Sequence, residues 1–381
     1  MASVEYAKGL EGVIAAESSI CRIDGENGKL YYMGYPIRQL VEQCSFEEVT
    51  YLLLYGELPT VDQLTIFQRK MRHSRPISAP IQAMIRDFPR DSHPMELLQA
   101  VVSYLSGYVE HKIQHDANCN CRITLHQVSQ LATVVATLHR FRSGKEYVEP
   151  REDLSHGANF LYMLRGSEPS ELEGKIMDDC LTLHAEHSFN ASTFTARVVA
   201  STLSTCYCSI SAAIGALYGS LHGGANEKVM AMVDEVGELS RVDAWVNEAL
   251  DQKRKIMGMG HRVYKAKDPR AIVVEGYLER LGAEKGETRY YDILKRIETL
   301  FRERMEEKGK PIYPNVDFFS GALYRLLGIP SSLFTPVFAI ARAPGWLAHV
   351  LEQRSDNRIF RPKALYVGHQ QREVIPIEQR G

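Results

Sequence analysis

Apolar residues three and four positions apart recur through most of the chain after residue 37, and this helical period constrains the fold more than any other feature. No run of strands alternating with helices supports a parallel sheet. We therefore predict an all-α fold with one short β-hairpin near the start, where residues 18–37 alternate on both sides of Gly25–Gly28. The expected helical segments are 37–60 (stopping at Gly56), 61–73, 94–111, 122–143, 168–187, 191–217, 224–236, 241–255, 269–282, 289–308, 317–327 and 332–353, with a Pro-rich connector at 76–94.

The charge balance argues against two classes of partner. With 45 basic and 47 acidic residues the net charge is −2, so no bulk positive field would hold a nucleic acid or an anionic membrane. Residues 193–218 are apolar but rich in Ser and Thr, which favours a buried helix or helix pair over a membrane span.

The N-terminal segment MASVEYAKGLEGVIAAESS has neither a secretory signal pattern nor a transit-peptide pattern. Seven cysteines are too dilute and too odd in number for a secreted disulfide framework. We therefore expect a cytoplasmic protein with reduced thiols.

Glycine and proline cluster in three loops, at 218–226, 257–270 and 310–317. If residues 224–327 form a separate unit of about five helices, all three loops lie near its borders with the rest of the chain. We predict a large helical domain of residues 1–223 and 328–381 and a small domain of 224–327. Because ligand sites favour clefts between domains, the site is expected where these loops meet.

Two histidines lie beside glycines in these loops, His222 in SLHGGANEKV and His261 in MGMGHRVYK. Glycine lets a ligand or another backbone approach without a Cβ in the way. A helix beginning near Ala225 would point free N–H groups at the first loop and favour a neutral imidazole, which donates one N–H to a developing oxyanion. The alternative for either loop alone is a glycine-rich turn with an incidental histidine.

Asp317 follows the extended segment YPNV and precedes two phenylalanines. Capping the next helix would be an ordinary use of such a residue. Next to aromatic rings and away from water, a carboxylate also becomes a stronger base. One carboxylate and two imidazoles at one cleft favour abstraction of a proton next to a carbonyl, with neutral donors holding the enolic oxygen.

Three arginines, Arg270, Arg342 and Arg361, lie close to prolines that fix the local chain direction. Guanidinium groups bind carboxylates in bidentate fashion, so these arginines favour a polycarboxylate substrate over solvated surface charges. His187 and Asn190, in HAEHSFNAST, offer further donors to a carboxylate. The alternatives are a satisfied helix-end histidine at 187 and capping of the next helix by Asn190 or Ser192.

A rival zinc site can be imagined in the segment 110–127, from His111, His115, Cys119, Cys121 and His126. The Cys-x-Cys spacing is not the usual chelating pair and no second pair follows, so we expect no metal. GMGHRV also begins like a dinucleotide fingerprint, but the third glycine and the preceding strand are missing.

Five segments resemble the citrate synthase family, in the family's order and spacing over nearly the whole chain: LHAEHSFNASTFTARV, GSLHGGANEKVM, MGMGHRVYKAKDPRA, YPNVDFFSG and DNRIFRPKALYVG. The likeness is to the shorter bacterial and archaeal members, and 2-methylcitrate synthases share these segments. It implies an almost all-α homodimer whose small domain closes over the substrates, with no metal or redox cofactor. The chain lacks the N-terminal extension of the hexameric members, which argues against inhibition by NADH.

The resemblance also implies a role for each site residue. Asp317 would take a methyl proton from acetyl-CoA, His222 would support the enol, and His261 would polarise the oxaloacetate carbonyl, after which citryl-CoA is hydrolysed. Oxaloacetate would be held by His187, Asn190, His261, Arg270, Arg342 and, from the partner subunit, Arg361. Coenzyme A would be contacted by Met259, Gly260, Lys265, Lys310 and Asn315.

Two alternatives stay open at this point. A 2-methylcitrate synthase would prefer propionyl-CoA, a difference of one methylene in an acyl pocket that the sequence does not define. A non-catalytic helical protein would use the His/Cys segment for metal binding or as a scaffold, and stoichiometric zinc would support it.

Overall fold

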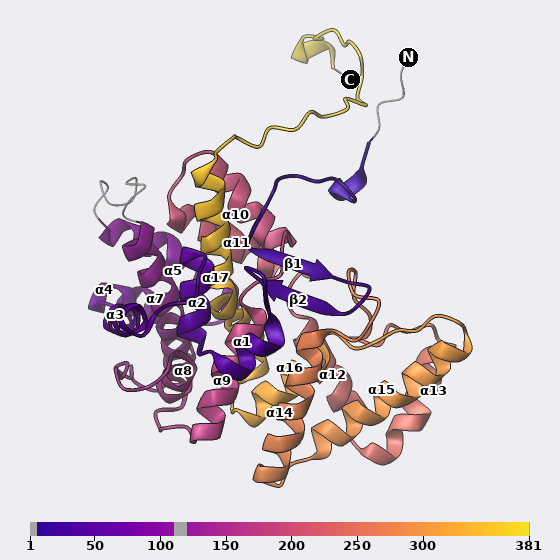
Figure 1. Ribbon diagram of the computed structural model, residues 1–381. Coiled ribbons are helices and arrows are strands. Elements are labelled where there is room, and N and C mark those ends of the chain that lie inside the picture. The colour runs from indigo at the N-terminus through magenta and orange to yellow at the C-terminus, as the bar shows by residue number, and fades with distance from the viewer. Residues whose placement is uncertain (1–5, 110–119, 381) are drawn as a thin grey trace.

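The computed structural model describes residues 6–109 and 120–380, and helices make up most of them (Figure 1). This confirms the predicted all-α class. The first half contains α1 (Ile37–Gln43), α2 (Phe46–Tyr55), α3 (Val61–His73), α4 (Ala79–Asp87), α5 (Pro94–Leu105), the 3₁₀ turn η2 (Ser106–Tyr108), α7 (Asn120–Arg142), α8 (His156–Arg165) and α9 (Glu171–His184). The second half contains α10 (Ala191–Ser201), α11 (Cys206–Tyr218), α12 (Ala225–Val236), α13 (Val242–Asp251), α14 (Pro269–Lys285), α15 (Arg289–Glu307), α16 (Asp317–Leu326) and α17 (Phe334–Ser355).

The predicted hairpin is confirmed. Strand β1 (Cys21–Asp24) pairs antiparallel with β2 (Lys29–Tyr32), with Asp24 opposite Lys29, and β3 (Tyr35–Pro36) adds to β2. The Asp24 carboxylate accepts the backbone N–H and the side-chain amide of Asn27, at 3.1 and 2.9 Å, and so closes the turn.

Caps divide two of the predicted helices. The segment 37–60 forms α1 and α2, because Ser45 and Glu48 make a capping box that starts the second helix. The segment 191–217 forms α10 and α11, because Thr205 accepts the backbone N–H of Cys208 and caps α11. Two helices, α4 and α8, lie where none was predicted, and α4 occupies the expected Pro-rich connector.

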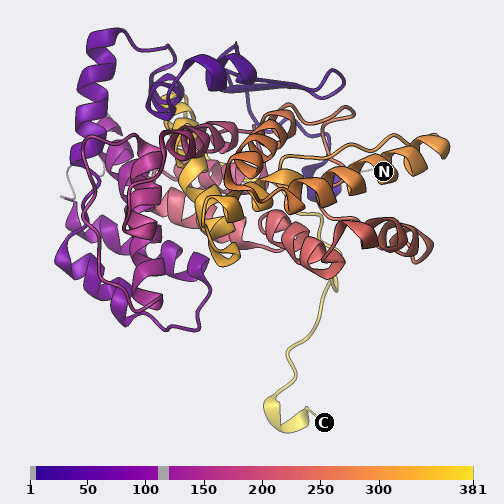
Figure 2. The ribbon, with the colours of Figure 1, turned by 90° about the horizontal axis from the view of Figure 1, so that it is seen from below.

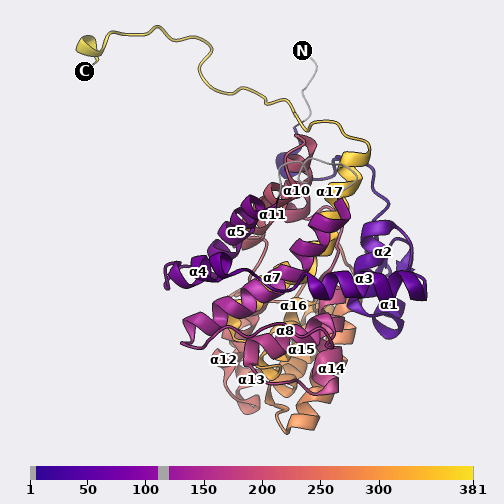
Figure 3. The same cartoon turned by 90° about the vertical axis from the view of Figure 1, so that its left-hand side faces the viewer.

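Helix α17 is the centre of the large core. It packs against α2, α7, α9, α10 and α11, and its side chains are almost all buried, Trp346 completely (Figure 3). In the part of the chain that is described, no helix is both long enough and apolar enough to span a bilayer.

Helices α12 to α16 pack on one another at one side of the molecule, in salmon to orange on the right of Figure 2. Helix α14 also contacts α1 and α9. These five helices correspond to the predicted small unit, whose boundaries at 224 and 327 stay a prediction. Past α17 the chain continues as an extended, exposed segment on the same side of the molecule as the first described residues (Figure 1).

Candidate active site

His222 lies in a tight turn between α11 and α12. The backbone N–H groups of His222 and Gly223 both donate to the Gly219 carbonyl, at 2.8 and 3.1 Å. A Cβ on Gly223 would lie 2.3 Å from the Leu217 carbonyl oxygen, and Gly224 has a left-handed φ of 75°. The two glycines are therefore required by the turn that presents His222.

Ser192, in the first turn of α10, fixes the proton on this imidazole. Its backbone N–H donates to His222 Nε2 at 3.2 Å, and its hydroxyl lies 2.8 Å from the same atom. The buried Trp346 indole N–H donates to that hydroxyl at 3.1 Å. Because Nε2 accepts an N–H, the neutral ring carries its proton on Nδ1. Burial, and then the charge of Arg342, lower the pKa of His222 to about 4.

His261 has the opposite tautomer. Its Nδ1 accepts the backbone N–H groups of Val263 and Tyr264, at 3.0 and 3.2 Å, so the proton lies on Nε2. Burial, and then Arg270, lower the pKa of His261 to about 4, which keeps the ring neutral. The ring lies edge-to-face with His187, with 5.3 Å between centroids.

Asp317 is the first residue of α16, but its side chain caps nothing; its own N–H donates to Asn315 Oδ1 at 3.0 Å. Burial raises the pKa of Asp317 to about 6, although Arg270 pulls it down. The carboxylate faces the same small pocket as His222. That pocket is lined by His222, Gly223, Gly224, Ala225, Asn226, Asp317, Thr335 and Phe338.

Arg270 is buried and forms a two-pronged ion pair with the buried Asp268, Nε to Oδ1 at 3.0 Å and Nη2 to Oδ2 at 2.8 Å. Asp268 also caps α14 and accepts the N–H of Val316 at 3.3 Å, so it joins the start of α14 to the segment that leads into α16. Burial alone would lower the pKa of Arg270, but the Asp268 carboxylate raises it, and the guanidinium stays charged.

Arg342 is buried within α17. Its Nε donates to the His184 carbonyl at 2.7 Å, and its guanidinium lies 4.7 Å from the centre of the Phe338 ring. Burial lowers its pKa, an effect opposed by the buried carboxylate of Glu186. The positive charge of Arg342 lowers the pKa values of His222, His187 and Asp317.

His187 and Asn190 lie between α9 and α10. His187 Nε2 lies 3.1 Å from the Tyr264 hydroxyl, and burial, then Arg270, keep its pKa well below the usual value. Asn190 caps α10, accepting the N–H of Thr193 at 3.0 Å, and also contacts the Ser192 hydroxyl at 2.7 Å. The capping alternative is thus correct for Asn190, which reaches His222 through Ser192.

The residues assigned to coenzyme A form two groups. Met259 and Gly260 lie on a segment that pairs with 313–315: Gly260 N–H donates to the Tyr313 carbonyl at 2.8 Å, and the Asn315 amide donates to the Gly260 carbonyl at 2.8 Å. The two lysines, Lys265 and Lys310, are exposed at the surface, and Lys265 pairs with Glu26.

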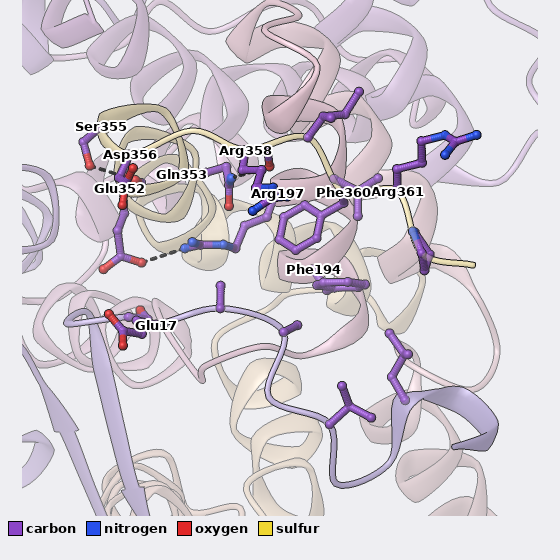
Figure 4. Close-up of a pocket in the computed structure, with 18 of the residues that line it drawn as sticks. Glu17, Phe194, Arg197, Glu352, Gln353, Ser355, Asp356, Arg358, Phe360 and Arg361 are labelled. Carbon is purple, nitrogen blue, oxygen red and sulfur yellow. Dashed lines mark hydrogen bonds and ion pairs between the residues drawn. The ribbon is translucent and has the colours of Figure 1, made fainter. Parts of the chain in front are cut away.

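Arg361 does not join the other site residues of its own chain. It is exposed on the extended segment after α17, at the edge of a large pocket formed with N-terminal residues, α10 and the end of α17. Figure 4 shows it away from the Arg197–Glu352 ion pair of that pocket.

A family model described as "Citrate synthase, C-terminal domain" matches residues 9–363. The chain belongs to the citrate synthase family. It is 45% identical over 376 residues to a citrate synthase of Deinococcus radiodurans, covering 98% of this chain and 99% of that one. It is 39% identical over 373 residues to a 2-methylcitrate synthase of Shewanella oneidensis, covering 98% and 97%. A citrate synthase of Thermoplasma acidophilum, solved as a ternary complex with carboxymethyl coenzyme A and oxaloacetate, superposes with a TM-score of 0.92 at 33% identity, covering 99% of this chain and all of that one.

Members of this family are acyltransferases, and the predicted family and enzyme class are both confirmed. Of the residues named for the zinc alternative, His111, His115 and Cys119 and the side chain of Cys121 lie outside the described residues. Among those that are described, no cluster of three His, Cys, Asp or Glu side chains could hold a metal ion.

Four supporting residues were missed from sequence: Ser192, Asp268, Tyr264 and Trp346. Asp268 could have been found, because an Asp before a Pro at the first helical position is a helix-start signal. Tyr264 and Trp346 gave no local signal, since their partners are 77 and 154 residues away.

Proposed function

We propose that this member of the family is a citrate synthase, which condenses acetyl-CoA with oxaloacetate and hydrolyses citryl-CoA to citrate and coenzyme A. The observation that carries the proposal is the pairing of Asp317 and His222 in one pocket. A carboxylate with a raised pKa there faces an imidazole held neutral with its proton on Nδ1.

Enolisation is the first step. The Asp317 carboxylate takes a proton from the methyl group of acetyl-CoA, for which a pKa of about 6 makes it a better base than an ordinary aspartate. His222 Nδ1–H donates to the thioester oxygen as negative charge develops there. A neutral imidazole is a better hydrogen-bond donor to the weakly basic enol oxygen than an imidazolium cation, because the cation would transfer its proton to that oxygen.

Condensation uses the second imidazole. His261 Nε2–H donates to the ketone oxygen of oxaloacetate, and the enol carbon attacks the polarised carbonyl carbon. The C=O π bond opens as the C–C bond forms, and the oxygen gains one proton to become the hydroxyl of citryl-CoA, in balance with the proton that Asp317 took from the methyl group. Arg270, Arg342 and His187 hold the two carboxylates of oxaloacetate; both guanidinium groups are buried, where charge-assisted hydrogen bonds are strong. Water then attacks the thioester of citryl-CoA, and coenzyme A leaves.

Arg361 would reach the oxaloacetate site from the partner subunit of a homodimer. Its exposure on a segment that leaves the body supports this. The same segment exposes seven large apolar side chains, an unusual number for a solvated tail: Ile359, Leu365, Tyr366, Val367, Val374, Ile375 and Ile377.

We expect the pocket shared by His222 and Asp317 to favour the smaller thioester. Thr335 lines this pocket, and its hydroxyl donates to Glu227 at 2.8 Å. One extra methylene in such a pocket is worth about 1–3 kcal/mol. We expect kcat/KM with oxaloacetate to be roughly 10–200 times higher for acetyl-CoA than for propionyl-CoA. A preference for propionyl-CoA would instead support a 2-methylcitrate synthase.

The pH dependence of kcat/KM for acetyl-CoA should report Asp317. Since His222 and His261 both have pKa values of about 4, they stay neutral from pH 5 upward. The base must be ionised, so activity should fall as the pH drops through about 6, the pKa of Asp317. Steady-state rates between pH 5 and 8 test this; a flat profile down to pH 5 would contradict the assignment.

A further inference from the structure

The turn of the N-terminal hairpin packs directly on the loop that carries His261. We call residues Asp24–Gly28 the hairpin tip. The Gly25 carbonyl accepts the backbone N–H of Lys265 at 2.9 Å. A Cβ on Gly25 would lie 2.2 Å from the Val263 carbonyl oxygen, and a Cβ on Gly28 would lie 3.0 Å from the Lys267 carbonyl oxygen. Two backbones are thus in contact at the two glycines.

The loop residues touched by the hairpin tip are those that orient His261. Val263 and Tyr264 donate the two N–H groups that His261 Nδ1 accepts, and Lys265 follows immediately. The Tyr264 hydroxyl reaches His187 at 3.1 Å. A shift of residues 263–265 would therefore move both imidazoles.

Other contacts hold the far end of this loop. Lys267 Nζ lies 2.6 Å from Glu275 on α14 and 2.7 Å from the buried Glu298 on α15. Asp268, the next residue, caps α14. Between this anchor and His261, the hairpin tip supplies the backbone contact on residues 263 and 265.

We propose that the hairpin tip is a positioning element for His261: it holds residues 263–265 so that Nδ1 keeps its two N–H donors and Nε2–H points at the ketone of oxaloacetate. This inference rests on the proposed function. It gives Gly25 a role in the reaction although Gly25 touches no substrate.

Gly25 is a suitable site for the test because its φ lies outside the left-handed region. Alanine there adds a Cβ without straining the backbone. In Gly25→Ala the new methyl group must displace the Val263 carbonyl. Gly276→Ala on α14 is the matched control, since its Cβ would meet no atom within 4 Å and its φ is also unexceptional.

The experiment measures kcat together with the infrared carbonyl band of bound oxaloacetate. In the wild type, the donor at the ketone should lower the band below its solution frequency. Gly25→Ala should move the band back toward that frequency and lower kcat roughly 10–100-fold, as expected for a misplacement near 1 Å. Gly276→Ala should leave both unchanged, and circular dichroism should show both variants folded.

If Gly25→Ala does not fold, a second variant tests the same proposal. Asp24→Ala removes the two hydrogen bonds that close the turn and adds no volume. It should shift the band in the same direction by a smaller amount. If the wild type is active and the folded variants keep its kcat and carbonyl band, the role of the hairpin tip is wrong and the proposed function stands. If the wild type releases no coenzyme A, the proposed function itself is wrong.

Discussion

Asp317→Asn is expected to remove nearly all turnover and, at pH 7, to make the protein more stable. The amide cannot accept the methyl proton, and the loss of a positioned base lowers kcat by roughly 10²–10⁴-fold. The gain in stability follows from the pKa, which is about 6 in the fold against 3.8 ordinarily. Burial disfavours the ionised carboxylate, so folding is penalised above pH 6 and the penalty vanishes below pH 3.8.

This penalty is at most about 3 kcal/mol at pH 7, from about 1.4 kcal/mol per pKa unit. Urea unfolding at pH 7 should therefore show Asp317→Asn to be more stable than the wild type, and the difference should shrink as the pH falls toward 4. Asp62→Asn, on the exposed first turn of α3, is the control; it should leave kcat unchanged and lower stability by less than about 1 kcal/mol, through the lost interaction with the helix dipole. A variant with wild-type kcat, or one less stable at pH 7, would contradict the role given to Asp317.

Prolines explain the clearest error in the predicted fold. The segment 76–94 was expected to be a connector because prolines interrupt it. In the structure Pro80 lies in the first turn of α4 and Pro94 begins α5. Proline suits the first turn of a helix, where its missing N–H costs nothing, so here it marks helix starts.

The reacting groups were within reach of sequence reasoning, whereas their supports, apart from Asp268, were not. His222 and His261 lie in loops and Asp317 directly follows one, and the neighbouring glycines and aromatics signal close backbone approach and burial. The tautomer of His222 is set from far along the chain, since Ser192 reaches it across 30 residues, and Asp268 reaches Val316 across 48. Such tertiary hydrogen bonds leave no periodicity to detect.

Arg270→Gln is expected to cost both oxaloacetate binding and much of the free energy of unfolding. The guanidinium is the partner of Asp268, a carboxylate with 0% exposure. Removing one member of a buried ion pair leaves the other uncompensated, a loss of about 3–5 kcal/mol. Urea unfolding and the KM for oxaloacetate measure the two effects, and KM should rise by at least tenfold because a charge-assisted hydrogen bond to a carboxylate is lost.

The structure supplies two controls for this prediction. Arg296→Gln breaks an ion pair of the same shape with Asp243, at 2.7 Å, but with its side chains 42% and 53% exposed. It should cost less than about 1 kcal/mol. The double variant Asp268→Asn with Arg270→Gln removes both buried charges, so it should regain part of the lost stability without regaining oxaloacetate affinity. If Arg270→Gln and Arg296→Gln lower the free energy of unfolding by the same amount, the buried Asp268 carboxylate is not stabilised by Arg270. The backbone N–H groups that donate to Asp268 would then be enough to join α14 to α16.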